Sequence, residues 1–98
     1  MDKYPLLAPE ELDEGLKKLE GWKTEENGKW LVRTRMLPSF KEAVAFVNEV
    51  AAIAEKMNHH PFIGIDYRRV TLRLTTWHSG GLTRLDLESA QAYDRILK

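Results

Sequence analysis

The chain has 98 residues, of which 43% are apolar and 31% charged, and its 15 basic and 15 acidic side chains give a formal net charge of zero. This length fits one domain, residues 1–98, with a single modest core. A net charge of zero disfavours a nucleic-acid binder that works through bulk positive charge. It also gives little electrostatic protection against self-association, so we expect an oligomer.

The absence of cysteine excludes disulfides, a thiolate nucleophile and a cysteine-based zinc site. The first five residues lack the apolar core of a signal peptide, and no apolar run approaches the roughly 18 residues of a membrane span. We therefore expect a cytoplasmic protein without a membrane partner.

The first predicted helix begins at Pro9, because proline is favoured at the first helical position, and acidic residues follow in the first turn. Leucines then recur at helical spacing, and Gly21 is expected to end the helix. These leucines are Leu12, Leu16 and Leu19.

Residues 22–37 predict a β-hairpin. Asn27-Gly28 indicates a two-residue turn, since both residues tolerate positive φ. Pro38 is expected to end the second strand.

A second, longer helix is predicted from the capping box of Ser39 and Glu42 to about Met57. Its apolar residues form two adjacent rows, a stripe wider than a surface helix needs to cover its own sheet. Either the helix is central and well buried, or part of the stripe packs against another subunit. One row is Phe40, Val44, Val47, Ala51 and Ala54; the other is Ala43, Phe46, Val50, Ile53 and Met57.

Residues 62–67 and 69–77 predict a second pair of strands with a tight connection at Tyr67-Arg68. Ile63, Ile65 and Tyr67 then share one face of the first strand, and Val70, Leu72 and Leu74 share one face of the second. If the second strand stays regular to Trp77, this aromatic side chain lies on the polar face with Thr71, Arg73 and Thr75. It would there cover an edge, an interface or a site.

Ser79-Gly80-Gly81 predicts a loop, and Thr83 with Asp86 predicts a weaker capping box at the start of the last helix. The apolar positions of this helix are Leu85, Leu87, Ser89, Ala92, Tyr93, Ile96 and Leu97. The element order therefore predicts an α+β fold, helix-hairpin-helix-hairpin-helix, in which helices pack on one face of a four-stranded antiparallel sheet.

The segment His59-His60-Pro61 has two interpretations. Histidines near a helix C-terminus complement the helix dipole, and proline often follows such an end. An adjacent pair of histidines is also an acid–base device that works near neutral pH. Spacing alone favours the first interpretation. A zinc site is disfavoured, because adjacent ligands rarely reach one ion with good geometry and His78 is the only other histidine.

A wider pattern changes this balance. Its members are Glu55, His59, His60, Pro61, Tyr67, Trp77 and Asp86, accompanied by Thr75-Thr76 and Gly81-Leu82-Thr83. This pattern resembles that of the pterin-4a-carbinolamine dehydratases, and the resemblance covers essentially the whole chain. Many members of that family carry a third histidine where this chain has Trp77, and others carry tryptophan. His78 would point to the opposite face of a regular strand, so we do not assign it the role of that histidine.

The resemblance implies loss of water from a 4a-hydroxytetrahydropterin to give a quinonoid dihydropterin, without a metal or cofactor. His59 is expected to be the principal acid–base group, with His60 orienting the pterin or sharing the proton transfer. Glu55 is expected to hold the imidazole of His59, one helical turn on, and Asp86 to fix the pocket. The implied catalytic residues are His59, His60 and Trp77, the last as an aromatic wall. The implied substrate-binding residues are Glu55, His59, His60, Pro61, Tyr67, Thr76, Trp77, His78, Ser79 and Asp86.

The expected partners are a pterin and further copies of the chain, as a homodimer or homotetramer, without direct nucleic-acid contact. Two other functions stay open. Members of the family can serve as dimerisation cofactors of a transcription factor, which the apolar stripe on the second helix would fit. A pterin-binding protein without activity is the other alternative, because Trp77 cannot transfer a proton near neutral pH.

Overall fold

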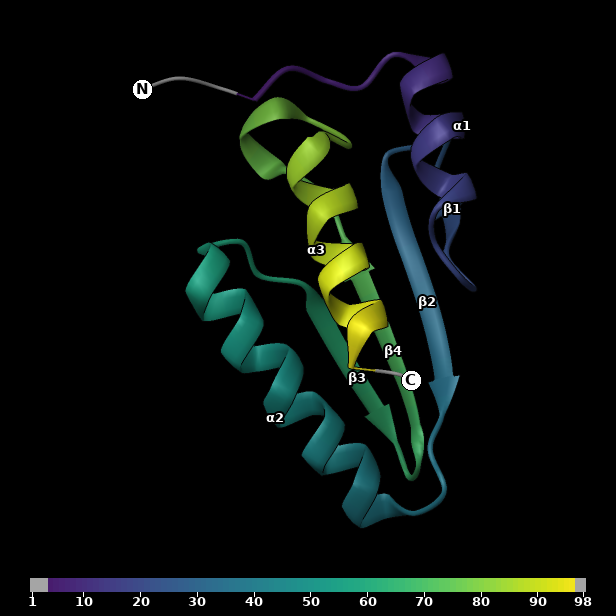
Figure 1. The fold of residues 1–98 in the computed structure, drawn as a ribbon, viewed down its shortest axis with the longest axis vertical. Helices are drawn as coiled ribbons and strands as arrows, with labels where there is room; N and C mark the ends of the chain where they lie inside the picture. Colours follow the sequence, from purple (N-terminus) through teal and green to yellow (C-terminus); the bar gives the residue numbers. More distant parts are fainter. Residues whose placement is uncertain (1–3, 97–98) are drawn as a thin grey trace.

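Three helices cover one face of a four-stranded antiparallel sheet in the computed structural model, which describes residues 4–96 (Figure 1). The strand order is β1-β2-β4-β3. The α+β fold predicted from the sequence is therefore confirmed. In chain order the elements are α1 (Pro9–Lys17), β1 (Lys23–Glu25), β2 (Trp30–Met36), α2 (Phe40–Met57), β3 (Phe62–Asp66), β4 (Arg69–Leu74), the 3-10 helix η1 (Trp77–Ser79) and α3 (Arg84–Arg95).

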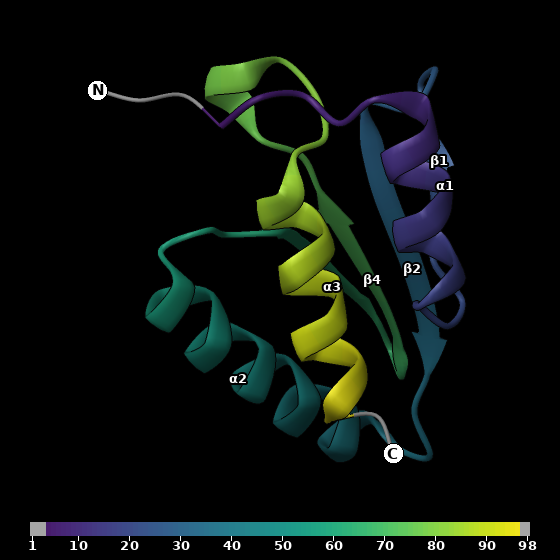
Figure 2. The same cartoon turned by 45° about the horizontal axis from the view of Figure 1, so that its top comes forward.

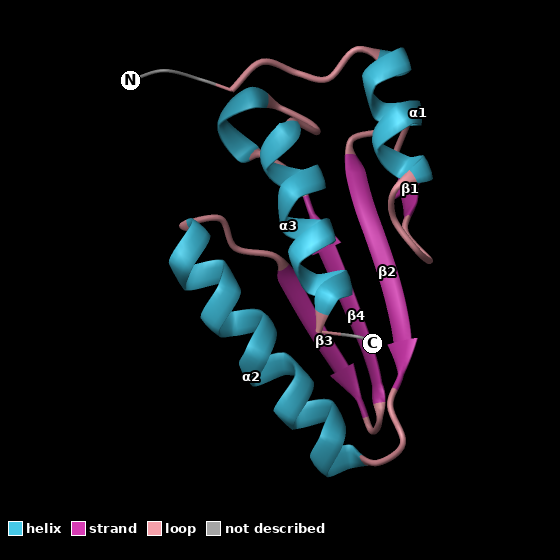
Figure 3. Cartoon of the chain, in the orientation of Figure 1, coloured by secondary structure: helices cyan, strands magenta, loops and turns pink. Residues whose placement is uncertain are grey.

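The long helix α2 connects two strands that are not neighbours. It carries the chain from β2 past β4 to the sheet edge, where β3 forms a hairpin with β4 (Figure 3). Among residues 4–96, no helix is both long enough and apolar enough to cross a membrane. Leu97, expected as an apolar position of the last helix, lies outside the described residues.

The core lies between the sheet and the helices. Leu31, Leu72 and Leu74 are fully or almost fully buried on the inner face of β2 and β4, and Phe46 of α2 and Tyr93 of α3 pack against them. Burial of one such side chain contributes about 1.5–3 kcal/mol. The register supports the predicted faces of Ile63 and Ile65, which lie opposite Leu72 and Val70. Tyr67, predicted on the same face, lies instead in the turn after β3, with a φ of 58°.

The first helix ends earlier than predicted. It stops at Lys17, and Gly21 uses its positive φ of 78° in the turn that leads to β1. That turn brings Trp22 into the core, where its ring lies 6.4 Å from the ring of Tyr93 and its indole nitrogen donates to Asp94 at 2.8 Å. Gly21 therefore serves the packing of its neighbour and does not end the helix.

The turn of the first hairpin was also predicted too short. Glu25 pairs with Trp30, so the turn has four residues, 26–29. Glu26, Asn27 and Gly28 all have positive φ, and the amide of Lys29 donates to the carbonyl of Glu25 at 3.1 Å. The Asn-Gly signal located the turn correctly, but Glu26, the residue before it, also adopts positive φ and belongs to the turn.

Helix α2 begins as predicted, with the hydroxyl of Ser39 accepting the amide of Glu42 at 3.1 Å. One of its two apolar rows faces the sheet: Ala43, Phe46 and Val50 are buried. The other row is buried only at Ala54, whereas Ala51 is exposed and Phe40 is 53% exposed. The stripe is thus wider than the contact with this chain's own sheet requires.

Strand β4 ends at Leu74, three residues before the predicted end at Trp77. The amide of Thr76 donates to the carbonyl of Gly81 at 2.9 Å, and Gly80 closes the intervening turn with a φ of 79°. Trp77 therefore starts the short helix η1 and is 71% exposed. The regular-strand geometry that we used to orient His78 does not exist, and that argument was wrong.

Candidate active site

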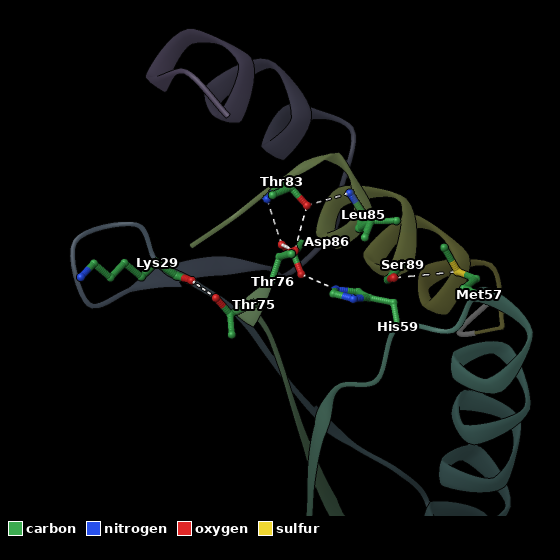
Figure 4. A network of polar contacts seen from close by, with 9 residues as sticks. All are labelled: Lys29, Met57, His59, Thr75, Thr76, Thr83, Leu85, Asp86 and Ser89. Atoms are coloured by element: carbon green, nitrogen blue, oxygen red, sulfur yellow. Dashed lines mark hydrogen bonds and ion pairs between the residues drawn. The ribbon is translucent and has the colours of Figure 1, made fainter. Parts of the chain in front are cut away.

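The candidate site begins where α2 ends. Asn58 follows the helix in the left-handed conformation, with a φ of 52°, and the amide of His59 donates back to the carbonyl of Ala54 at 3.1 Å. Asparagine is one of the few residues other than glycine that adopt this helix-ending conformation readily. The chain therefore leaves the helical path at Asn58, and His59 points toward α3 (Figure 4).

The imidazole of His59 and the carboxylate of Asp86 form a hydrogen bond that links the end of α2 to the start of α3. The Nε2 atom of His59 lies 2.7 Å from Oδ1 of Asp86; the side chains of the two residues are 11% and 0% exposed. The other carboxylate oxygen, Oδ2, accepts the hydroxyl of Thr76 at 2.7 Å and the amide of Thr83 at 2.9 Å. Asp86 thus caps α3 and holds a histidine from another element with the same carboxylate.

The hydrogen bonds around Asp86, drawn as dashed lines in Figure 4, allow one consistent assignment of donors and acceptors. The hydroxyl of Thr76 has one proton, and Oδ2 of the Asp86 carboxylate can only accept, so Thr76 donates to Asp86. The hydroxyl of Thr83, 2.8 Å from that of Thr76, must then donate to Thr76, while it accepts the amide of Leu85 at 3.2 Å. His59 donates from Nε2, which leaves its Nδ1 as the nitrogen available to a reactant.

His60 pairs with the carboxylate of Glu55. Its Nε2 lies 2.6 Å from Oε2 of Glu55, and the two side chains are 54% and 78% exposed. The expectation that Glu55 holds the imidazole of His59 is therefore not met. The spacing rule for one helical turn fails here because the left-handed Asn58 turns His59 away from the face that carries Glu55.

A cavity of about 730 Å³ opens beside these histidines. Its lining combines the end of α2, the segment after β4 and the N-terminal segment. The lining residues are Tyr4, Asn58, His59, His60, Thr75, Thr76, Trp77, His78, Ser79 and Leu85.

Most of the predicted substrate-binding residues converge on this cavity. His59, His60, Thr76, Trp77, His78 and Ser79 line it. Asp86 reaches it through His59, and Glu55 through His60. Pro61 follows His60 directly, whereas Tyr67 lies in the turn between β3 and β4, at the opposite end of these strands from the cavity.

Four lining residues were not predicted: Tyr4, Asn58, Thr75 and Leu85. Asn58 precedes the paired histidines and is an ordinary helix-ending residue, and Thr75 belongs to the Thr-Thr pair, so adjacency could have suggested both. Nothing local indicates Tyr4, because its place depends on contacts with residues more than seventy positions away.

Comparisons with known proteins identify the family of this chain. A family model described as "Pterin 4 alpha carbinolamine dehydratase" matches residues 5–96. A protein of Sulfurisphaera tokodaii named "Putative pterin-4-alpha-carbinolamine dehydratase" is 43% identical over 91 residues, which are 93% of this chain and 96% of that protein.

Two solved structures share the fold. The crystal structure of a transcriptional coactivator/pterin dehydratase from Brucella melitensis superposes with a TM-score of 0.90 at 31% identity, covering 95% of this chain and 99% of that one. A pterin dehydratase-like protein identified as a RuBisCO assembly factor in the alpha-carboxysome has a TM-score of 0.58 at 20% identity, covering 82% of this chain and 88% of that one, a likeness of fold alone. From the match over residues 5–96 and the similarity to these relatives, we conclude that this chain belongs to the pterin-4a-carbinolamine dehydratase family.

Proposed function

We propose that the protein dehydrates a 4a-hydroxytetrahydropterin to the quinonoid dihydropterin, with His59 as the principal acid–base group. The observation that carries this proposal is the hydrogen bond between His59 and the buried carboxylate of Asp86 at the cavity. A buried carboxylate that accepts Nε2–H fixes the orientation and tautomer of an imidazole and stabilises the positive charge that appears when the ring takes a proton. Family membership supports the reaction class.

The reaction needs two proton transfers and no net change in protonation. The C4a–O bond breaks as the hydroxyl accepts a proton and leaves as water, while the lone pair of the adjacent N5 forms the C4a=N5 double bond. N5 then gives up its proton. A well-placed acid–base group accelerates such steps by about 10²–10⁴-fold.

We assign the two histidines different parts of this reaction. His59, almost buried and held by Asp86, has its Nδ1 free for proton transfer with the reacting centre. His60, exposed beside Glu55, is positioned to exchange protons with solvent and to orient the pterin. Trp77, exposed at the cavity, supplies an aromatic surface for the flat heterocycle.

The test is the dehydration rate of a 4a-hydroxytetrahydropterin, measured with wild type and with His59→Ala. We expect His59→Ala to lower kcat by about 10²-fold or more while circular dichroism and the melting temperature show an intact fold. A variant with near-wild-type kcat would remove His59 from this role. Pterin binding by the wild type without any acceleration would favour an inactive pterin-binding protein.

We also propose that the protein is a homodimer or a larger homo-oligomer that pairs through β3. This edge strand is exposed along its whole length, and it carries the large apolar side chains Phe62, Ile63 and Ile65. An exposed apolar edge strand is a template for pairing with another chain. The zero net charge supports self-association. A cytoplasmic location stays a prediction.

A further inference from the structure

The N-terminal segment lies across the turn that carries Trp77. The amide of Leu7 donates to the carbonyl of Leu82 at 2.9 Å, and the hydroxyl of Ser79 donates to the carbonyl of Tyr4. Figure 2 shows this segment passing over η1 on its way to α1. Two hydrogen bonds, one at each end, therefore connect residues 4–7 to residues 79–82.

The ring of Tyr4 is held as well as its backbone. The guanidinium carbon of Arg84 lies 4.8 Å from the centre of the ring, within the range of a cation–π contact. Arg84 is itself held by Glu88, one helical turn further along α3, with a donor–acceptor distance of 3.0 Å. Tyr4 is thus a partly buried aromatic side chain with a restricted position, and it lines the same cavity as His59 and Trp77.

The cavity has titratable groups and aromatic groups from different parts of the chain. His59 and His60 follow α2, whereas Trp77 belongs to η1 and Tyr4 to the N-terminal segment. Rigid aromatic rings bind planar heterocycles by stacking, with little loss of side-chain entropy when the ring is already held. Neither the hydroxyl of a tyrosine nor the indole is needed for the proton transfers proposed above.

We propose that Tyr4 is a substrate-binding residue, whose ring forms an aromatic wall of the cavity together with Trp77 and sets the affinity for the planar part of a reduced pterin. The inference rests on the proposed function for the identity of the ligand. Tyr4 would act in binding and not in the chemical step. Substitutions of Tyr4 should therefore change KM and the dissociation constant and leave kcat unchanged.

The experiment measures two quantities on each variant. Isothermal titration calorimetry gives the dissociation constant for 7,8-dihydrobiopterin, a stable reduced pterin that carries no 4a-hydroxyl. The dehydration assay gives kcat and KM. For Tyr4→Ala we expect the dissociation constant and KM to rise about tenfold, the effect of losing one stacking contact. Tyr4→Phe should restore both values, because it keeps the ring.

Leu6→Ala is the control for general loosening of the segment. Leu6 lies two residues from Tyr4, does not line the cavity and is largely exposed, so pterin affinity should stay within about twofold of wild type. The proposal is overturned if Tyr4→Ala binds the dihydropterin like wild type, if Tyr4→Phe is as weak as Tyr4→Ala, or if Leu6→Ala has the same effect. A wild type that binds the dihydropterin but does not dehydrate the substrate would contradict the proposed reaction alone, and the binding comparison would still decide the role of Tyr4.

Discussion

Asp86→Asn tests the centre of the proposed site, because it removes one charge and almost no volume. The carboxylate accepts three donors: Nε2–H of His59, the hydroxyl of Thr76 and the amide of Thr83. The amide of Thr83 can only donate, so the side-chain oxygen of an asparagine must face it. The side-chain NH₂ then points at His59 and requires that Nε2 carry no proton. The remaining proton of the neutral imidazole moves to Nδ1, the nitrogen assigned to the reaction.

The size of the expected fall in kcat follows from this change of tautomer. We expect kcat to fall by about 10²–10⁴-fold, the range attributed to a positioned acid–base group. Replacing charge-assisted hydrogen bonds of a fully buried carboxylate by neutral ones should cost about 1–2 kcal/mol of stability. For a domain of this size that lowers Tm by roughly 5–15 °C, so the protein should remain folded at assay temperature.

The assay compares kcat and its pH dependence for Asp86→Asn, wild type and the control Asp13→Asn. Asp13 lies exposed on α1, outside the cavity lining, and receives the same chemical change. A folded Asp86→Asn variant whose kcat stays within about threefold of wild type would refute the assignment of His59 as a histidine controlled by Asp86.

Three further predictions concern stability and assembly. Asp94→Ala should cost about 3 kcal/mol in the free energy of urea unfolding, because it leaves the nearly buried guanidinium of Arg33 without its carboxylate at 2.8 Å; a loss below about 1 kcal/mol would contradict a buried pair. Burial, reinforced by the negative charge of Asp86, raises the pKa of Tyr93 from 10.0 to about 12, so the unfolded state ionises first and stability is lost as pH rises from 10 toward 12. That loss should reach roughly 2 kcal/mol at pH 12, measured by urea titration as the difference between wild type and Tyr93→Phe in the free energy of unfolding. The same dependence of this free energy on pH in both proteins would contradict the prediction. Ile65→Lys at the exposed edge strand should lower the molar mass measured by light scattering, and an unchanged mass would remove β3 as the interface.

Local signals predicted the parts of this protein that depend on neighbouring residues. The start of α2 follows from the serine cap at Ser39, and the start of α3 follows from the capping box of Thr83 and Asp86, both of which are present. The two hairpins follow from strand patterns interrupted by turn residues. The approach of His59 and Asp86 to one site was implied by the family pattern and not by any local rule.

Tertiary structure decided which groups meet. Asn58 adopts a left-handed conformation at the end of α2. Because of this change in backbone direction, Glu55 contacts His60 and Asp86 contacts His59, whereas helical spacing predicts a contact between Glu55 and His59. The early end of β4 likewise depends on the bridge between Thr76 and Gly81, and the place of Tyr4 on hydrogen bonds to a turn near the other end of the chain. The sequence by itself therefore determined the elements and the residue types of the site, since caps, turns and periodicity act within a few residues. The pairing of each histidine with its carboxylate, and the aromatic wall of the cavity, depend on contacts between distant segments that only the packed structure brings together.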